Sequence, residues 1–84
     1  MAGYHLADIE KGEFGKLSKI KEELEEVYDA EAQENKIMIL VELSDMIGAM
    51  QGYLDKKFDG KIDINDLLRM AKATHRAFRS GHRK

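Results

Sequence analysis

The stretch KEELEEVYDA, residues 21–30, places four glutamates within five positions of a segment with helical periodicity. The cluster works against local stability, because like charges three or four residues apart on a helix repel each other by roughly 0.2–0.5 kcal/mol. A glutamate run on an exposed helix is most often a solvated face, so this stretch alone leaves its purpose open. The apolar spacing predicts an α-helix over residues 16–33, with one face formed by Leu17, Ile20, Leu24, Val27 and Tyr28.

A second stretch, VELSDMIGAM at residues 41–50, contains two acids in an otherwise apolar setting. Glu42 and Asp45 are the only charged residues between positions 37 and 50. Isolated carboxylates in such a setting cost on the order of several kcal/mol unless they are paired, protonated or bound to a metal. The segment predicts a helix over residues 36–56 that is apolar on nearly every side, which indicates a partner subunit. Its predicted core stripe consists of Ile39, Leu43, Ile47, Met50 and Leu54.

In the rest of the chain glycines mark the predicted turns, and the sequence contains no proline. Three glycines predict irregular structure or a short helix in residues 1–15. After a turn at KFDGKID, Asp63 is a predicted N-cap with Asp66 as its capping-box partner, and a third helix is expected over residues 64–78. We therefore predict one all-α domain over residues 1–84. At 84 residues, this small helical bundle module is expected to be completed by homo-oligomerisation.

The composition of the chain excludes several classes of function. The net charge of -2 gives no basic field, so no stable nucleic-acid partner is expected. The absence of cysteine excludes disulfides and thiolate chemistry. We see no apolar signal core and no stretch approaching a membrane span of about 20 residues, so we expect a soluble, cytoplasmic protein without membrane contact.

The two acidic pairs can meet if the first two helices pack antiparallel across a short turn. Glu23 and Glu26 would then face Glu42 and Asp45, with no lysine or arginine between positions 37 and 55 to neutralise them. Oxygen-rich sites of this kind suit hard divalent cations such as Mg²⁺ or Mn²⁺. The alternative for the second pair is an ion pair with the basic C-terminal region.

The pattern Glu22-Glu23-x-x-Glu26, fifteen intervening residues and then Glu42-x-x-Asp45 resembles the EExxE…ExxD signature of the MazG-like all-α nucleoside triphosphate pyrophosphohydrolases. The resemblance implies Mg²⁺-dependent hydrolysis of a nucleoside or deoxynucleoside triphosphate to the monophosphate and pyrophosphate, in a homodimer or homotetramer. It implies Glu23, Glu26, Glu42 and Asp45 as metal ligands. Glu22 would be a further ligand, or the catalytic group that orients or deprotonates the water. Phosphoribosyl-ATP pyrophosphohydrolase activity, on a similar scaffold, is the alternative within the fold.

Basic side chains are the candidates for binding substrate phosphates. Lys19 shares a helix face with Glu23, so phosphate contact and a plain i, i+4 salt bridge both fit it. Lys72, Arg76 and Arg79 form a basic stripe on the last helix, which suits either phosphate recognition or the helix C-terminal dipole. The three histidines, including His5, are interpreted as packing or surface residues.

Two alternatives belong to other function classes. Residues 55–66 resemble an EF-hand loop, but Lys57 occupies a ligand position and Asp66 replaces the terminal glutamate. The apolar second helix equally fits a helical interaction module without chemistry. In that case Glu42 and Asp45 would pair with basic residues across the interface.

Overall fold

The computed structural model describes residues 5–79, in which the chain forms three α-helices and no strand. Helix α1 spans Leu17–Ala32, α2 spans Lys36–Lys57 and α3 spans Ile64–Arg79. Each boundary lies within one residue of the predicted one, and the all-α prediction is confirmed. Homo-oligomerisation stays a prediction. Residues 1–4 of the predicted irregular segment and residues 80–84, with His82, lie outside the described part of the chain.

Local side-chain chemistry explains where the helices begin. The Asn35 side chain caps α2 by accepting a hydrogen bond from the Met38 N–H at 3.0 Å. At the start of α3 the Asp63 N–H donates to Asp66 Oδ2 at 3.0 Å, and the Asp66 N–H donates to Asp63 Oδ1 at 3.1 Å. This reciprocal pair is the predicted capping box. It also engages two of the carboxylates that an EF-hand reading would need as calcium ligands.

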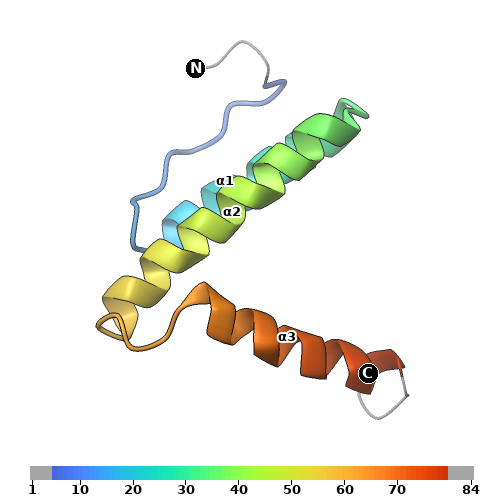
Figure 1. Cartoon of the computed structure of the whole chain (residues 1–84). Helices are drawn as coiled ribbons and strands as arrows, with labels where there is room; N and C mark the ends of the chain where they lie inside the picture. The colour runs from blue at the N-terminus through green and yellow to red at the C-terminus, as the bar shows by residue number, and fades with distance from the viewer. Residues whose placement is uncertain (1–4, 80–84) are drawn as a thin grey trace.

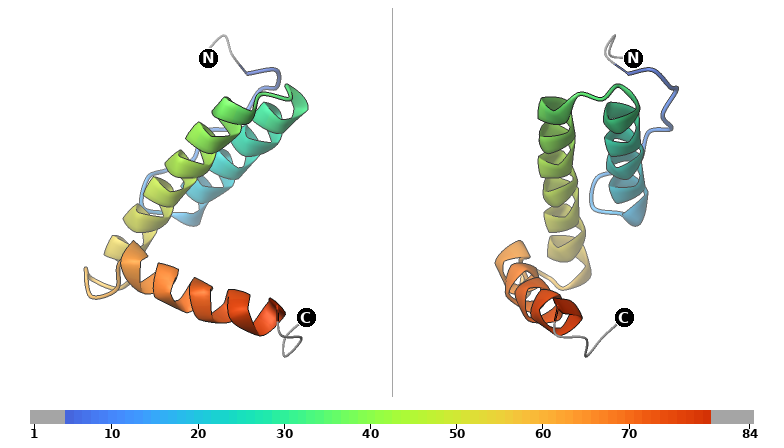
Figure 2. Two further views of the ribbon diagram at one scale, coloured as in Figure 1. Left: turned by 45° about the vertical axis from the view of Figure 1, so that its right-hand side comes forward. Right: turned by 90° about the vertical axis from the view of Figure 1, so that its right-hand side faces the viewer.

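Helices α1 and α2 lie side by side and antiparallel, whereas α3 leaves the end of α2 at an angle (Figure 1, Figure 2). The turn between α1 and α2 is only residues 33–35, so the two helices pack along their length. Within residues 5–79, α3 packs against α2 and makes no helix–helix packing with α1. The Ile64 N–H joins α3 to α2 by donating to Gln51 Oε1 at 3.0 Å.

Among the described residues, the buried positions of α1 and α2 are small residues and acids, with Leu54 as the one large aliphatic side chain. Ala30 and Ala49 are buried, and so is Gly52, over which the Phe14 ring packs. The predicted core stripe of α2 is therefore only partly correct: Leu54 is buried, but Leu43 and Ile47 are more than 40% exposed. Small side chains let the two backbones approach closely, which leaves the large aliphatic residues facing outward in the single chain.

Helix α2 is long and apolar enough, by length and composition alone, to cross a membrane, a test that the sequence was expected not to meet in any segment. A mostly buried core helix of a soluble protein passes the same test, but only 22% of this window is buried within the described residues. Glu42 and Asp45 lie near the middle of α2, where an acid in a bilayer costs about 2.5–3.5 kcal/mol.

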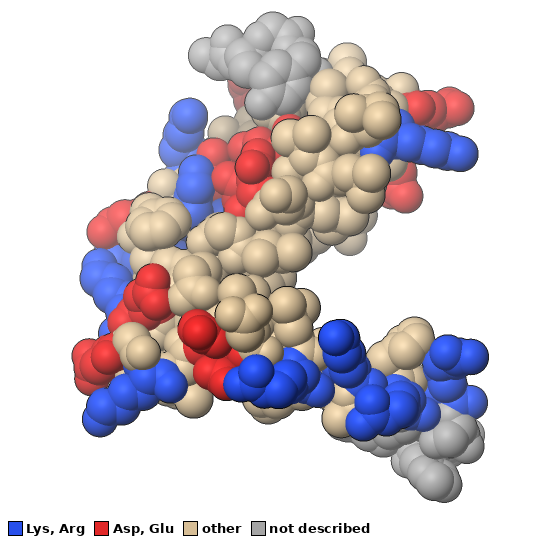
Figure 3. Space-filling view, in the orientation of Figure 1, with Lys and Arg blue, Asp and Glu red and all other residues tan. Residues whose placement is uncertain are grey.

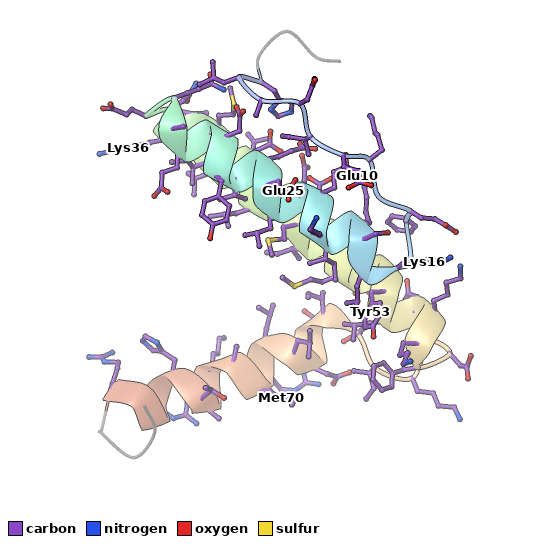
Figure 4. The ribbon with its side chains drawn as sticks, turned by 180° about the vertical axis from the view of Figure 1, so that it is seen from behind. Glu10, Lys16, Glu25, Lys36, Tyr53 and Met70 are labelled. Carbon is purple, nitrogen blue, oxygen red and sulfur yellow. The ribbon has the colours of Figure 1, made fainter. Side chains whose placement is uncertain are left out.

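Residues 5–13, called the N-terminal segment below, run beside α1 without helical structure (Figure 2, Figure 4). Two buried carboxylates of α1 hold the segment. Asp29 accepts hydrogen bonds from the N–H groups of Leu6 and Ala7 at 2.8 Å, and Glu22 accepts one from the Gly12 N–H at 2.9 Å. The segment is thereby fixed along the outer side of α1, and Figure 4 shows Glu10 on it next to Glu25 on the helix.

Gly12 permits this close approach, and we expect Gly12→Ala to destabilise the fold by about 1–3 kcal/mol. A Cβ at position 12 would overlap the backbone of Ser18 and Lys19 at the start of α1. Urea denaturation followed by circular dichroism measures the effect. The control is Gly48→Ala, because nothing lies within 4 Å of a Cβ at that helical position. The control should stabilise the protein by about 0.5–1 kcal/mol, and equal effects of the two substitutions would contradict the packing described here.

Candidate metal centre

The acids predicted from the sequence converge where α1 faces α2. Glu23, Glu42 and Asp45 each offer an oxygen atom, and these three atoms lie within 4.8 Å of one another. Glu22, Glu23 and Glu26 form a second group with the same property. The two groups share Glu23, so all five predicted acids belong to one cluster. It is called the carboxylate cluster below.

Helix geometry explains this convergence. Residues three apart on a helix share a face, so Glu23 and Glu26 project from α1 in nearly the same direction, as do Glu42 and Asp45 from α2. The short turn sets the register that brings these two faces together. Glu22 points instead toward the N-terminal segment, where its Oε1 accepts a hydrogen bond from the Gly12 N–H. Glu22, Glu23 and Glu42 are buried and Glu26 is half-buried, whereas Asp45 is exposed.

Two buried carboxylate oxygens in the cluster have no hydrogen-bond partner within the described residues, Glu23 Oε1 and Glu42 Oε1. Glu42 is only 1% exposed and is the largest fully buried side chain of residues 5–79. An unsatisfied buried polar atom costs about 1–3 kcal/mol, and more when the group is charged. The Glu23 carboxylate has Lys19 at its other oxygen, and Glu42 shares a hydrogen bond with Glu26, so the unmet requirement is confined to the two Oε1 atoms.

The sequence left open that Glu42 and Asp45 form ion pairs with basic side chains. Neither acid forms an ion pair with a lysine or arginine of residues 5–79. The basic stripe of α3 comprises Lys72, Arg76 and Arg79, and it lies on a helix that does not pack against α1. Figure 3 shows lysine and arginine side chains along α3, apart from acidic side chains beside the α1–α2 pair. Within one chain, the structure does not bring this stripe to the carboxylate cluster.

The electrostatics of the cluster are those of crowded acids. Burial, reinforced by a shared hydrogen bond with Glu42 and by the charge of Glu23, raises the pKa of Glu26 from 4.5 to about 8. Burial also raises the pKa of Glu23, although Lys19 opposes this effect. The raised pKa favours the protonated form of Glu26 in the absence of a cation. A divalent ion would replace that proton and favour the ionised form.

Glu22 and Lys19 form the edge of the cluster. Burial raises the pKa of Glu22, but hydrogen bonds from the Gly12 N–H and from Lys19 outweigh it and lower the pKa overall. Lys19 Nζ lies 3.0 Å from Glu22 Oε1 and 3.3 Å from Glu23 Oε2, and these contacts, with that to Glu22 first, raise the pKa of Lys19. Lys19 thus forms the i, i+4 salt bridge with Glu23 that was one of the two roles predicted for it. It is also the positive side chain nearest to the cluster among the residues described.

Sequence reasoning missed two residues near this centre. Asp29 continues the i, i+3 series from Glu26 on α1, so its spacing could have revealed it. It is buried and holds the N-terminal segment. His5 lies with Glu26 and Glu42 in a third group whose potential ligand atoms are within 4.8 Å of one another. No local signal marks His5, because its position depends on where the segment crosses α1.

Comparison with known proteins adds no relative. No protein-family model, curated protein or solved structure matches this chain.

Proposed function

We propose that this protein is a Mg²⁺-dependent pyrophosphohydrolase that converts a nucleoside or deoxynucleoside triphosphate to its monophosphate and pyrophosphate. The proposal depends on one observation. Glu42 is fully buried, and its Oε1 has no hydrogen-bond partner within residues 5–79. The sequence resemblance supplies the reaction, and the carboxylate cluster supplies a place for the cation that the reaction requires.

The donor set fits a hard divalent ion. Glu23, Glu42 and Asp45 offer only carboxylate oxygens, which Mg²⁺ and Mn²⁺ prefer, and Glu26 adds another once it is ionised. Such an ion supplies charge neutralisation for the phosphates and lowers the pKa of a bound water. Glu22 is a member of the cluster, and its lowered pKa favours the ionised form, which suits it to orient that water by accepting a hydrogen bond.

Assembly is part of the proposal, because a single chain leaves large apolar surfaces exposed. Ile37, Leu40 and Val41 of α2 are all at least half exposed. Contiguous exposed apolar side chains are typical of interfaces, and a homodimer or homotetramer would cover these residues. In such an assembly, Lys72, Arg76 and Arg79 of one subunit would be available to bind phosphates at the cluster of another, with Lys19 contributing from within the chain.

The same exposed face favours a second candidate, a helical interaction module without enzymatic activity. In that case Glu42 and Asp45 would meet basic residues of a partner and not a metal ion. Mg²⁺ would then leave the melting temperature unchanged. In the proposed enzyme, Mg²⁺ raises the melting temperature because it neutralises the buried acids.

A nucleotide panel tests the reaction. We expect pyrophosphate and the monophosphate in equal amounts from at least one of the common ribo- and deoxyribonucleoside triphosphates with Mg²⁺ or Mn²⁺, and neither product with EDTA. The monophosphate is quantified by chromatography and pyrophosphate by a coupled assay. Phosphoribosyl-ATP is included for the alternative activity. Asp45→Asn should abolish turnover while circular dichroism stays unchanged. Intact triphosphates with both metals, or a diphosphate and phosphate as products, would refute the proposal.

A further inference from the structure

His5 lies at one end of the carboxylate cluster, where the N-terminal segment passes α1. Its side chain is only 10% exposed, and its Nε2 lies 3.5 Å from Glu26 Oε1. His5, Glu26 and Glu42 each offer an atom within 4.8 Å of the other two. Glu42 is the residue with the unpartnered, fully buried oxygen, so an observation independent of His5 also indicates a ligand here.

Asp29 lies on the other side of the His5 ring. His5 Nδ1 lies 3.6 Å from Asp29 Oδ1. Asp29 is itself fixed by the N–H groups of Leu6 and Ala7 and by the Gln33 side chain, at 2.7–3.0 Å. Metal-binding histidines typically have a carboxylate beside the ring nitrogen that does not bind the ion, and Asp29 takes that place here. With Asp29 beside Nδ1, Nε2 is the nitrogen that faces Glu26.

We infer that His5 is a nitrogen ligand for a divalent metal ion that it holds together with Glu26 and Glu42. This position lies beside the all-oxygen position of Glu23, Glu42 and Asp45, and Glu42 belongs to both. The inference rests on the proposed metal-dependent function, since it adds a ligand to that cluster. It assigns a role to a residue that the sequence left as a packing or surface histidine.

The nitrogen ligand determines which metal this position prefers. Mg²⁺ is a hard ion that favours oxygen donors, whereas Mn²⁺ and later transition metals also accept imidazole. The His5 position is therefore selective for Mn²⁺ over Mg²⁺, while the all-oxygen position accepts either ion. With Mn²⁺ the cluster binds one ion more than with Mg²⁺.

Histidine NMR on the full chain tests this inference without any substitution. The metal-free protein is titrated with MnCl₂, and imidazole C–H resonances are followed, with His5→Asn used only to assign the His5 signal. We expect substoichiometric Mn²⁺ to broaden the His5 resonance while the His75 resonance, from α3, persists. Broadening of His5 shows that Mn²⁺ binds close to the ring, and the calorimetry below decides whether His5 is a ligand of that ion.

Calorimetry on two variants completes the test. His5→Asn should weaken the Mn²⁺ affinity at least tenfold and remove one site, while changing the Mg²⁺ affinity less than threefold. The control, His75→Asn, should match the wild type. Wild-type Mn²⁺ binding in His5→Asn, or an unbroadened His5 signal while Mn²⁺ binds, would overturn the His5 assignment and leave the proposed function intact. Absence of both Mg²⁺ and Mn²⁺ binding to the wild-type protein would overturn the two together.

Discussion

Glu42→Gln is expected to reduce pyrophosphate release by at least about 10³-fold with Mg²⁺, a loss of roughly 4 kcal/mol in transition-state stabilisation. The substitution preserves the volume of a fully buried side chain but removes the charge that three neighbouring acids share. The metal would then lose a ligand that belongs both to the group of Glu23, Glu42 and Asp45 and to the group of His5, Glu26 and Glu42. Turnover is measured at saturating substrate and Mg²⁺, and metal binding by the Mg²⁺-induced rise in melting temperature.

Glu31→Gln is the matched control for this prediction. It makes the same chemical change on an exposed position of α1, away from the cluster. Turnover and the Mg²⁺-induced rise in melting temperature should both stay at the wild-type level. If Glu42→Gln retained turnover within threefold while its helical circular dichroism was intact, Glu42 would have no part in metal-dependent chemistry.

Features set by short-range interactions could be predicted from the sequence. Asn35, Asp63 and Asp66 mark helix starts because their side chains bond to backbone groups at most three residues away. The meeting of the acidic pairs was predictable for a related reason. Each pair shares a helix face by its spacing, and a turn of residues 33–35 leaves the two helices little choice but to pack antiparallel.

Features set by long-range packing could not be predicted. The amphipathic spacing correctly gave helices, but spacing alone does not say which face meets the neighbouring helix. Glu42 and Ala49 of α2 are buried while Ile47 is exposed, and Gly52 is covered by the Phe14 ring, which precedes α1. The position of the N-terminal segment could not be predicted either, because it depends on a hydrogen bond from Leu6 to Asp29, more than twenty residues away.

The metal-free protein is expected to become less stable as the pH rises from about 5 to 8, and Glu26→Gln should remove most of this loss. The folded-state pKa of Glu26 is raised from 4.5 to about 8, so the folded protein binds a proton that the unfolded chain releases across this range. Stability therefore falls with rising pH. Lowered pKa values, as for Glu22, Asp29 and Asp66, act with the opposite sign and only below this range.

At pH 9 without metal, Glu26→Gln should melt about 10 °C above the wild type, which corresponds to about 2 kcal/mol for a domain of this size. The difference should shrink to within a few degrees at pH 5, where Glu26 is protonated and resembles glutamine. Scanning calorimetry at both pH values with EDTA measures the effect. Glu31→Gln should show no pH-dependent difference.

Mg²⁺ at pH 9 should raise the melting temperature of the wild type more than that of Glu26→Gln, because only the wild type offers this carboxylate to the ion. A constant difference between Glu26→Gln and the wild type across the pH range would show that Glu26 is not held protonated by its crowded neighbours.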